Sequence, residues 1–377
     1  MRSTRWFWFT LVMLAMLAVF ACGNESDNYY NNYGNEYSND YSSDYNNNTG
    51  SDEAVAEEEY EDYTTSPEDC YEDEEYDPVD EMCYPIYECE GDECEAIDEA
   101  FYTLVDDLLG EYLSGDEDVE EEGVTTSEAA IITYEVQGNK IINPEPGAVT
   151  ADLRAYQDDA AAHERVWVLF ANLIPADQRN YISKFALYTD GPDEVLAYVE
   201  PDPDDPSRWV LSIDIVDAQN ADELIYTLVH EYAHILTLNE TQVAFDNEIF
   251  TEPDDETLYE EAEASCPNYF PGEGCSLNDS YINVFFDTFW TDIYDEWLES
   301  DSESDEFYLN HEDEFVTDYA ATNPAEDIAE SFMSFVLEPK PAGDTIAEEK
   351  VLFFYEYPEL VELRAEIIGR AYARLRR

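Results

Sequence analysis

The sequence predicts an α+β domain, made of a small mixed sheet, one central helix and a helical C-terminal lobe, behind a disordered acidic N-terminal tether. Three strand-like runs lie between residues 183 and 216, and a helix-like run follows directly. A second helix-like run, started by a proline, begins at residue 324. The segment 22–65 is rich in Asn, Tyr, Ser, Asp and Glu, so it cannot bury enough apolar area to offset its chain entropy.

The first 21 residues are typical of a signal peptide. Two arginines precede an apolar run, Trp6 to Phe20, which is short for a membrane span, although a signal anchor is the alternative. The run ends in Val-Phe-Ala-Cys, which is similar to a bacterial lipobox, and the lipid would then be carried by Cys22. Phe20 departs from the small residue usual there, so secretion without a lipid stays open. We expect an exported protein, anchored to an outer or cell-surface membrane through Cys22, or else secreted or periplasmic.

Charge limits the partners of this chain. The 377 residues include 93 Asp and Glu against 15 Lys and Arg, for a formal net charge of -78, and no Lys or Arg occurs between Arg5 and Lys140. Such a surface repels nucleic acid and attracts basic proteins and divalent cations. We therefore exclude a nucleic-acid function. A salt-adapted source and a solubilising acidic tail both account for this charge.

Cysteines mark a second acidic segment, residues 66–126. If Cys22 carries a lipid, six cysteines remain, an even number that fits disulfides in an oxidising compartment: Cys70, Cys83, Cys89, Cys94, Cys266 and Cys275. A zinc site built from the first four is the alternative, but their spacings lack the paired C-x-x-C of zinc ribbons. We predict that Cys266 and Cys275 close a local loop, whereas the pairing of the other four cannot be read from the sequence. A helical run at 97–113 belongs either to this segment or to the main domain.

Residues 127–377 are assigned to the main domain, whose globular pattern becomes clear from about Thr150. An amphipathic helix is predicted over 151–173, followed by strands over 183–188, 194–199 and 209–216. We expect a chain that begins near Gly138 to fold and to keep the activity of the full-length protein. Residues 240–310 form an acidic, aromatic insertion, in which the run 281–297 is interpreted as core or lid packing rather than a binding surface.

An H-E-x-x-H motif, His230-Glu231-x-x-His234, lies inside the helical run that follows the strands. Residues i and i+4 share one face of a helix, so both histidines can reach one metal ion. Glu231 is placed to act as a base toward water at that ion. A chance match and a pair of structural histidines are the alternatives. We favour zinc.

The third ligand is expected to be a carboxylate, because catalytic zinc sites use three protein ligands and the longer H-E-x-x-H-x-x-G-x-x-H motif fails at Thr237 and Glu240. Spacing similar to that of thermolysin reaches Asp254, which lies in a turn-like run, and Glu256 and Glu260 follow one turn apart. None of these three positions is convincing.

A better candidate is the segment 319–333. Pro324 suits the first turn of a helix, with Thr322 or Asn323 as the cap. Glu326 and Glu330 then share one face, so one carboxylate can bind metal while the other holds a ligating histidine. A charged, solvated helix face is the alternative.

The two motifs together resemble the gluzincins, and among them the catalytic domain of anthrax lethal factor and its relatives. In those proteins H-E-x-x-H is followed much later by Y-x-x-x-N-x-x-E-x-x-A-E-x-F, and residues 319–332 match this pattern. The resemblance implies a zincin-like fold in which His230, His234 and Glu326 bind zinc and Glu231 is the base. It also implies that Tyr319 stabilises the oxyanion and that Glu330 supports a ligand. The insertion at 240–310 is outside the pattern, so substrate specificity does not follow.

The sequence thus predicts an exported, lipid-anchored zinc metalloendopeptidase that acts on peptides or proteins and contacts the membrane through Cys22. The alternative is a surface adhesion or binding lipoprotein with a structural zinc site. Structural sites are closed by four ligands, whereas this sequence offers three and a base.

Overall fold

The computed structural model describes residues 129–191, 195–218, 224–252, 255–300 and 306–375, and the backbone of two short strands, β1 (Glu74–Asp77) and β2 (Met82–Pro85). These two strands pair antiparallel. The predicted signal peptide, tether and helical run at 97–113 lie outside the described residues, as do Cys22, Cys70, Cys89 and Cys94. Their interpretation stays a prediction.

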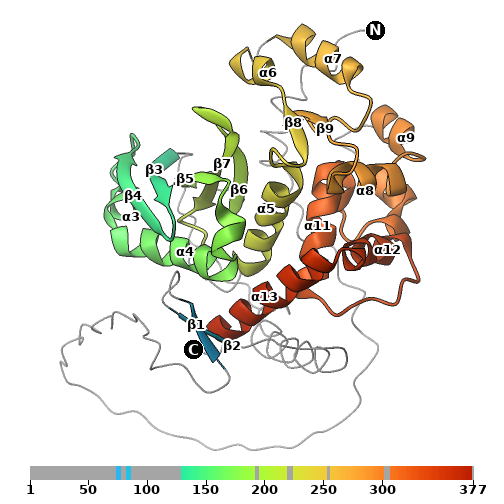
Figure 1. Cartoon of the computed structure of the whole chain (residues 1–377). Coiled ribbons are helices and arrows are strands. Elements are labelled where there is room, and N and C mark those ends of the chain that lie inside the picture. Colours follow the sequence, from blue (N-terminus) through green and yellow to red (C-terminus); the bar gives the residue numbers. More distant parts are fainter. Residues whose placement is uncertain are drawn as a thin grey trace, which may run out of the picture.

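A five-stranded mixed sheet forms one lobe (Figure 1). Its strands are β3 (Ala129–Gln137), β4 (Lys140–Pro146), β5 (Ile182–Thr189), β6 (Ala197–Asp202) and β7 (Asp205–Asp214). The order is β4-β3-β5-β7-β6, with β5 and β7 parallel and the other neighbours antiparallel. The small mixed sheet predicted from the sequence is therefore present, and β6 is one of its edges.

The sheet begins earlier than the sequence pattern indicated. β3 lies between β4 and β5 and buries Ile131, Ile132 and Tyr134. The sequence pattern missed β3 and β4, and the expectation that a chain beginning near Gly138 suffices is wrong, because that chain would lack a strand from the interior of the sheet.

Two further elements of this lobe differ from expectation. The single helix predicted over 151–173 is split into α3 (Arg154–Asp158) and α4 (Ala160–Leu173). Asp159 breaks it because its side chain accepts the N–H of Ala162 and so caps a new helix. The middle strand lies three residues later than predicted and includes Pro201, which an edge strand tolerates. A 3₁₀ turn, η2 (Ala176–Arg179), follows α4, whose Trp167 ring packs 5.3 Å from that of Phe185 in β5.

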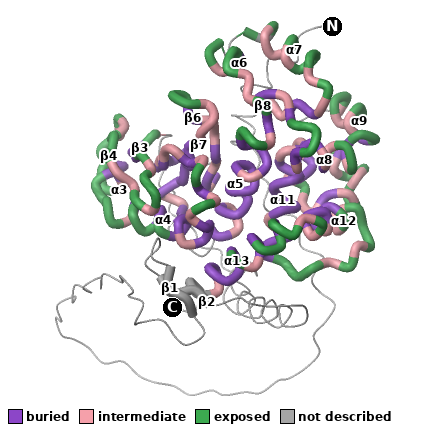
Figure 2. Tube along the Cα trace, in the orientation of Figure 1, coloured by how far each residue is buried: buried purple, intermediate pink, exposed green. Residues whose placement is uncertain are grey.

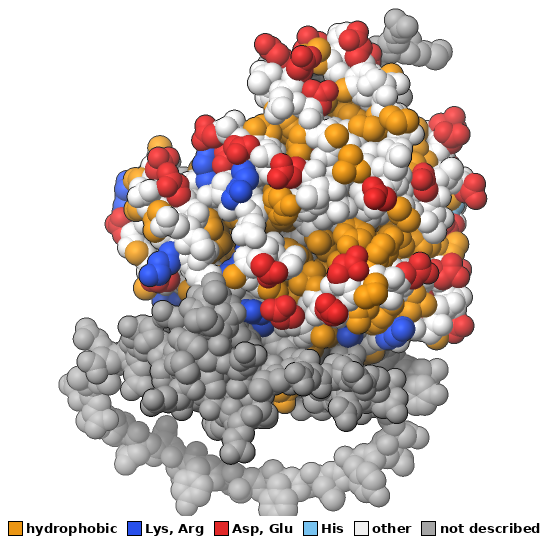
Figure 3. Space-filling view, viewed as in Figure 1, with side chains coloured by type: hydrophobic (Ala, Val, Ile, Leu, Met, Phe, Trp, Pro, Cys, Tyr) orange, Lys and Arg blue, Asp and Glu red, His pale blue; other side chains and the backbone are white. Residues whose placement is uncertain are grey.

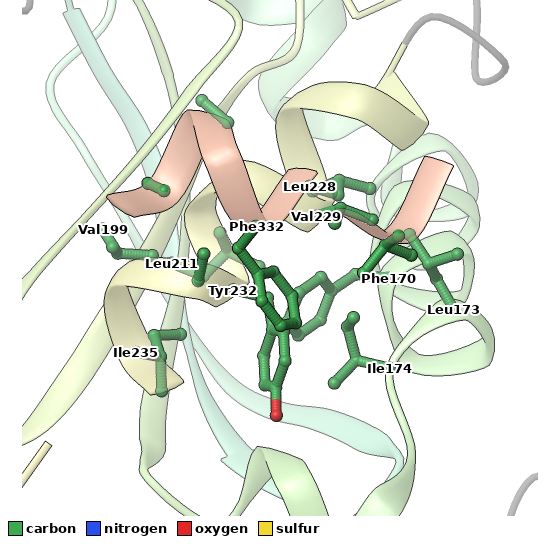
Figure 4. Packing of buried hydrophobic residues seen from close by; sticks show 14 of the residues in the cluster. Phe170, Leu173, Ile174, Val199, Leu211, Leu228, Val229, Tyr232, Ile235 and Phe332 are labelled. Carbon is green, nitrogen blue, oxygen red and sulfur yellow. The ribbon is translucent and has the colours of Figure 1, made fainter. Parts of the chain in front are cut away.

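The helix that carries H-E-x-x-H, α5 (Leu224–Leu238), lies between the sheet lobe and a lobe of helices (Figure 1). It is apolar or buried on nearly every side, and Figure 2 shows it as the buried centre of the molecule. In the core, Tyr232 of α5 packs against Phe332 with ring centroids 6.2 Å apart (Figure 4). Leu228 and Val229 are completely buried beside them.

The insertion and the helical lobe complete the chain. The insertion contains β8 (Val243–Phe245), α6 (Asn247–Thr251), α7 (Glu256–Ser265), β9 (Gly274–Ser276), α8 (Tyr281–Phe289), α9 (Tyr294–Glu299) and α10 (Glu306–Asn310). The lobe continues through η3 (Glu312–Glu314), η4 (Tyr319–Thr322), α11 (Pro324–Leu337), α12 (Ile346–Phe353), η5 (Phe354–Glu356) and α13 (Pro358–Leu375). No helix among the described residues has the length and apolar character needed to cross a membrane.

The insertion is built into the core. Cys266 and Cys275 form the predicted disulfide, and β8 pairs with β9. Gly274 has φ 157, and a Cβ there would lie 2.1 Å from the carbonyl oxygen of Ala244, so only glycine fits. Phe285 and Trp290 of the aromatic run are completely buried, which confirms core packing for that run.

Candidate metal centre

Three predicted ligand atoms converge between α5 and α11. Nε2 of His230 lies 3.1 Å from Nε2 of His234 and 3.1 Å from Oε2 of Glu326. The third side of the triangle, from Nε2 of His234 to Oε2 of Glu326, is 3.2 Å. All three side chains are buried, and the two elements that carry them pack together along the core shown in Figure 4.

Local sequence rules place each of these residues. His230 and His234 are one turn apart on α5 and therefore share a face. On α11, Asn323 is the N-cap and accepts the backbone N–H groups of Ala325 and Glu326, while Pro324 occupies the first turn. This cap fixes the start of α11, so Glu326 is in its first turn and Glu330 lies one turn later on the same face.

Glu330 holds the first histidine from behind. Its Oε1 lies 2.6 Å from Nδ1 of His230, and its Oε2 accepts a hydrogen bond of 2.8 Å from the hydroxyl of Thr317. Because a carboxylate accepts, Nδ1 of His230 carries the proton. Nε2 is then the lone-pair nitrogen of the neutral ring.

The donor set fits a metal ion. In the tautomer that Glu330 selects, Nε2 of His230 and Oε2 of Glu326 each point a lone pair at the other atom. Two acceptors at this distance repel, so a cation must lie between them or the ring must carry a second proton. In a tetrahedral zinc site with ligands at 2.0–2.2 Å, ligand atoms stand about 3.3–3.6 Å apart, slightly more than the separations here. Two imidazoles and one carboxylate are a common catalytic zinc set.

Burial and charge shift the pKa values as such a site requires. Burial lowers the pKa of His230, but its hydrogen bonds to Glu326 and Glu330 outweigh burial and raise the pKa well above its usual range. Burial raises the pKa of Glu326, yet the two histidines hold it well below its usual range. The centre therefore attracts positive charge, which a proton or a metal ion can supply.

Glu231 lies beside the three ligand atoms without binding among them. Burial raises its pKa to about 7, although both histidines and a hydrogen bond from the backbone N–H of Val199 act to lower it. Its Oε2 is buried and accepts no hydrogen bond from any residue that the structure describes. This oxygen is free to accept a proton from a molecule bound at the site.

Tyr319, in η4, covers another side of the centre. Its ring centroid lies 5.8 Å from that of His230, and its hydroxyl hydrogen-bonds to Glu326. Burial and the neighbouring carboxylates raise the pKa of Tyr319 well above its usual range, so the hydroxyl keeps its proton and is a donor. The side chain of Tyr319 is half-buried, and its hydroxyl lies next to the three predicted metal ligands.

The other candidates for the third ligand do not join this group. Glu260 is exposed on α7, Asp254 lies outside the described residues, and the side chain of Glu256 is not described. Only Glu326 shares a ligand group with His230 and His234 among the described residues.

Sequence reasoning missed three groups at the centre. Thr317 supports Glu330 from a loop with no motif of its own. Val199 contributes a backbone N–H from the edge strand β6, which no side-chain pattern reveals. Glu273, just before β9, has a buried Oε2 that contacts no hydrogen-bonding partner among the described residues, and it lies close enough to His234 for their charges to interact. Burial raises its pKa to about 7.

Comparisons with known proteins identify no family for this chain. No family model matches the chain, and no curated protein matches it. A solved structure of a candidate zinc-binding metallo-peptidase from Bacteroides caccae aligns with 76% of this chain and 96% of its own, at 14% identity and a TM-score of 0.24. A similarity this low carries no argument about the fold or the site.

Proposed function

We propose that this protein is a zinc-dependent peptidase. The observation that carries the proposal is the convergence of His230, His234 and Glu326 within 3.1–3.2 Å, beside a buried carboxylate that is not one of the three. Such a set supplies three ligands and a separate base, which is the composition of a catalytic zinc site. A closed structural site needs a fourth protein ligand, and the described residues offer none here.

The roles of the side chains follow from their positions. Zinc held by the three ligands would supply Lewis acidity, which polarises a carbonyl group and makes a neighbouring water more acidic. Glu231 accepts the proton of the attacking water at Oε2 and delivers it to the leaving amine. The hydroxyl of Tyr319 donates a hydrogen bond to the oxygen that becomes negative during attack, a contact typically worth a few kcal/mol. Glu330 keeps the ring of His230 in one orientation and one tautomer.

The edge strand β6 supports a peptide as the substrate. It pairs with β7 on one side and with no other strand that the structure describes. Its other side faces the centre, since the N–H of Val199 reaches Glu231. An extended peptide can add to an open strand edge through main-chain hydrogen bonds, which would bring its carbonyl groups alongside the ligands.

Export and lipid anchoring belong to the same proposal. They rest on the apolar run at 6–20 and on Cys22, and the disulfide between Cys266 and Cys275 fits an oxidising compartment. The acid-rich face in Figure 3 fits a partner that carries positive charge.

Zinc content and peptide cleavage, measured on the same protein, test the function. The wild-type chain should hold one zinc and cleave members of a peptide library, with loss of activity on chelation and recovery on adding zinc. Glu231→Gln should keep the zinc and lose nearly all cleavage. Zinc binding without cleavage by the wild-type protein would favour an adhesion or binding lipoprotein with structural zinc.

A further inference from the structure

Two adjacent acidic residues of α11 point into different parts of the molecule. Glu326 contacts the histidines of α5, whereas Asp327 contacts the helical lobe. Consecutive residues of a helix are about 100° apart around its axis. The contacts of Asp327 therefore constrain the rotation of the same helical turn that presents Glu326.

Asp327 is held by two donors from different elements. The Nζ atom of Lys350, on α12, lies 2.7 Å from its Oδ2, and Nε1 of Trp290, which follows α8, donates to the same oxygen at 2.7 Å. Ser331, one turn along α11, lies 3.5 Å from the other oxygen. Asp327, Lys350 and Trp290 are all 0% exposed.

Stability alone does not explain this buried pair. Asp327 and Lys350 are completely excluded from solvent, so the cost of desolvating the two charges offsets their attraction at 2.7 Å. Buried ion pairs can often be replaced by apolar residues without loss of stability, and the best-attested reason for keeping one is to select a single arrangement. Lys350 is further confined by the ring of Phe315, 3.8 Å from Nζ.

We propose that Asp327, Lys350 and Trp290 are positioning residues, which fix the rotation of α11 and thereby hold Glu326 against His230 and His234. The inference rests on the proposed metal centre. It gives the insertion a role, because Trp290 belongs to the insertion and its indole N–H connects that insertion to the turn that carries the third ligand. The insertion then helps to position a metal ligand in addition to packing against the core.

Trp290→Phe tests the inference with a minimal change, since it removes one indole N–H and keeps an aromatic ring. Trp209→Phe is the matched control, because Trp209 is 2% exposed and its Nε1 has no hydrogen-bond partner among the described residues. Zinc affinity is measured on the full chain by competition with a chelator, and the absorption spectrum of the cobalt-loaded protein reports the ligand set. We expect about tenfold weaker zinc binding and an altered cobalt spectrum for Trp290→Phe, as for loss of an outer contact of a metal site. The control should match the wild type.

A double variant separates positioning from stability. Asp327→Leu with Lys350→Met removes both charges together and leaves only the indole N–H of Trp290 without its acceptor, so the protein should stay folded, with a melting temperature lowered by no more than one unpaired buried donor costs. If the three residues position Glu326, this folded variant still binds zinc at least tenfold more weakly and shows a changed cobalt spectrum.

The outcomes are distinguishable. Wild-type zinc affinity in either the double variant or Trp290→Phe overturns the positioning role while leaving the proposed function intact. Equal losses of zinc affinity in Trp290→Phe and Trp209→Phe also overturn it, since any change to a buried tryptophan would then have the same effect. A wild-type chain that binds neither zinc nor cobalt overturns the proposed function together with this inference.

Discussion

Nδ1 of His230 lies 2.6 Å from Oε1 of Glu330, although the two residues are 100 positions apart in the chain. This contact joins α5 to α11 and sets the tautomer that leaves Nε2 available as a ligand. It also fixes Glu326, one turn before Glu330, next to the same histidine. The site therefore depends on the packing of these two helices.

Loss of Glu330 should weaken the metal centre without removing a ligand. We expect Glu330→Ala to lower zinc affinity by about 10–100-fold, because the ring of His230 loses its orienting partner. Thr317→Val, which removes only the hydroxyl that supports Glu330, should have a smaller effect in the same direction. Chelator competition measures both, with the exposed Glu362→Ala as the control. Unchanged affinity in Glu330→Ala would show that the 2.6 Å contact has no role in binding.

Tyr319→Phe should lower kcat by one to three orders of magnitude, roughly the cost of one lost oxyanion donor. Zinc affinity should change little, since the hydroxyl is not one of the three ligands. Steady-state kinetics on a cleaved peptide, with zinc content measured on the same sample, checks this expectation. A wild-type kcat would mean that Tyr319 only packs against His230.

Glu273→Gln should change which peptides are cleaved. No Lys or Arg occurs between Arg208 and Lys340, a stretch that contains both metal motifs and the insertion, so these segments offer no Lys or Arg partner for the buried carboxylate. A cationic substrate group can supply one, and a hydrogen bond to a charged group contributes about 1.5–3 kcal/mol. We expect kcat/KM to fall about tenfold or more for a Lys- or Arg-containing peptide and to stay constant for its neutral counterpart.

The matched control for that variant is Glu263→Gln, which alters an exposed acid on nearby α7. It should leave both peptides unaffected. An equal loss for cationic and neutral peptides in Glu273→Gln would mean that Glu273 acts on the structure of the site and not on specificity.

The two starting points for a truncated chain should behave differently. A chain of residues 127–377 keeps β3 and should fold and bind zinc. A chain that starts at Gly138 loses β3, which buries Ile131 and Ile132 and supplies the hydroxyl of Tyr134 to Nδ1 of His163 at 2.8 Å. It should be insoluble or melt at a much lower temperature. Circular dichroism on heating compares them, and insolubility of both would show that the domain needs residues 66–126.

Local rules explain which parts of the fold and site could be predicted from the sequence. The spacing of His230 and His234 sets their shared face without any tertiary information. Asn323 and Pro324 define the start of α11 by capping and by the fixed φ of proline, which in turn places Glu326 and Glu330. The disulfide between Cys266 and Cys275 follows from their short separation.

What the sequence could not predict depends on contacts between distant segments. The break between α3 and α4 results from a single Asp159 cap inside a run that reads as continuous helix. Thr317 and Val199 reach the centre only through the fold, and no pattern around them indicates a function. The ion pair of Asp327 and Lys350 joins two helices, and nothing in either local sequence indicates that these charged residues are buried together.

X-ray absorption at the zinc edge of the purified full chain tests the central claim most directly. Binding by His230, His234 and Glu326 predicts one zinc per chain, with a shell of nitrogen and oxygen atoms at about 2.0–2.2 Å and no sulfur. Glu326→Ala should reduce zinc occupancy sharply. A sulfur shell at about 2.3 Å would instead place zinc on cysteines, and either that result or a zinc-free protein would contradict the account.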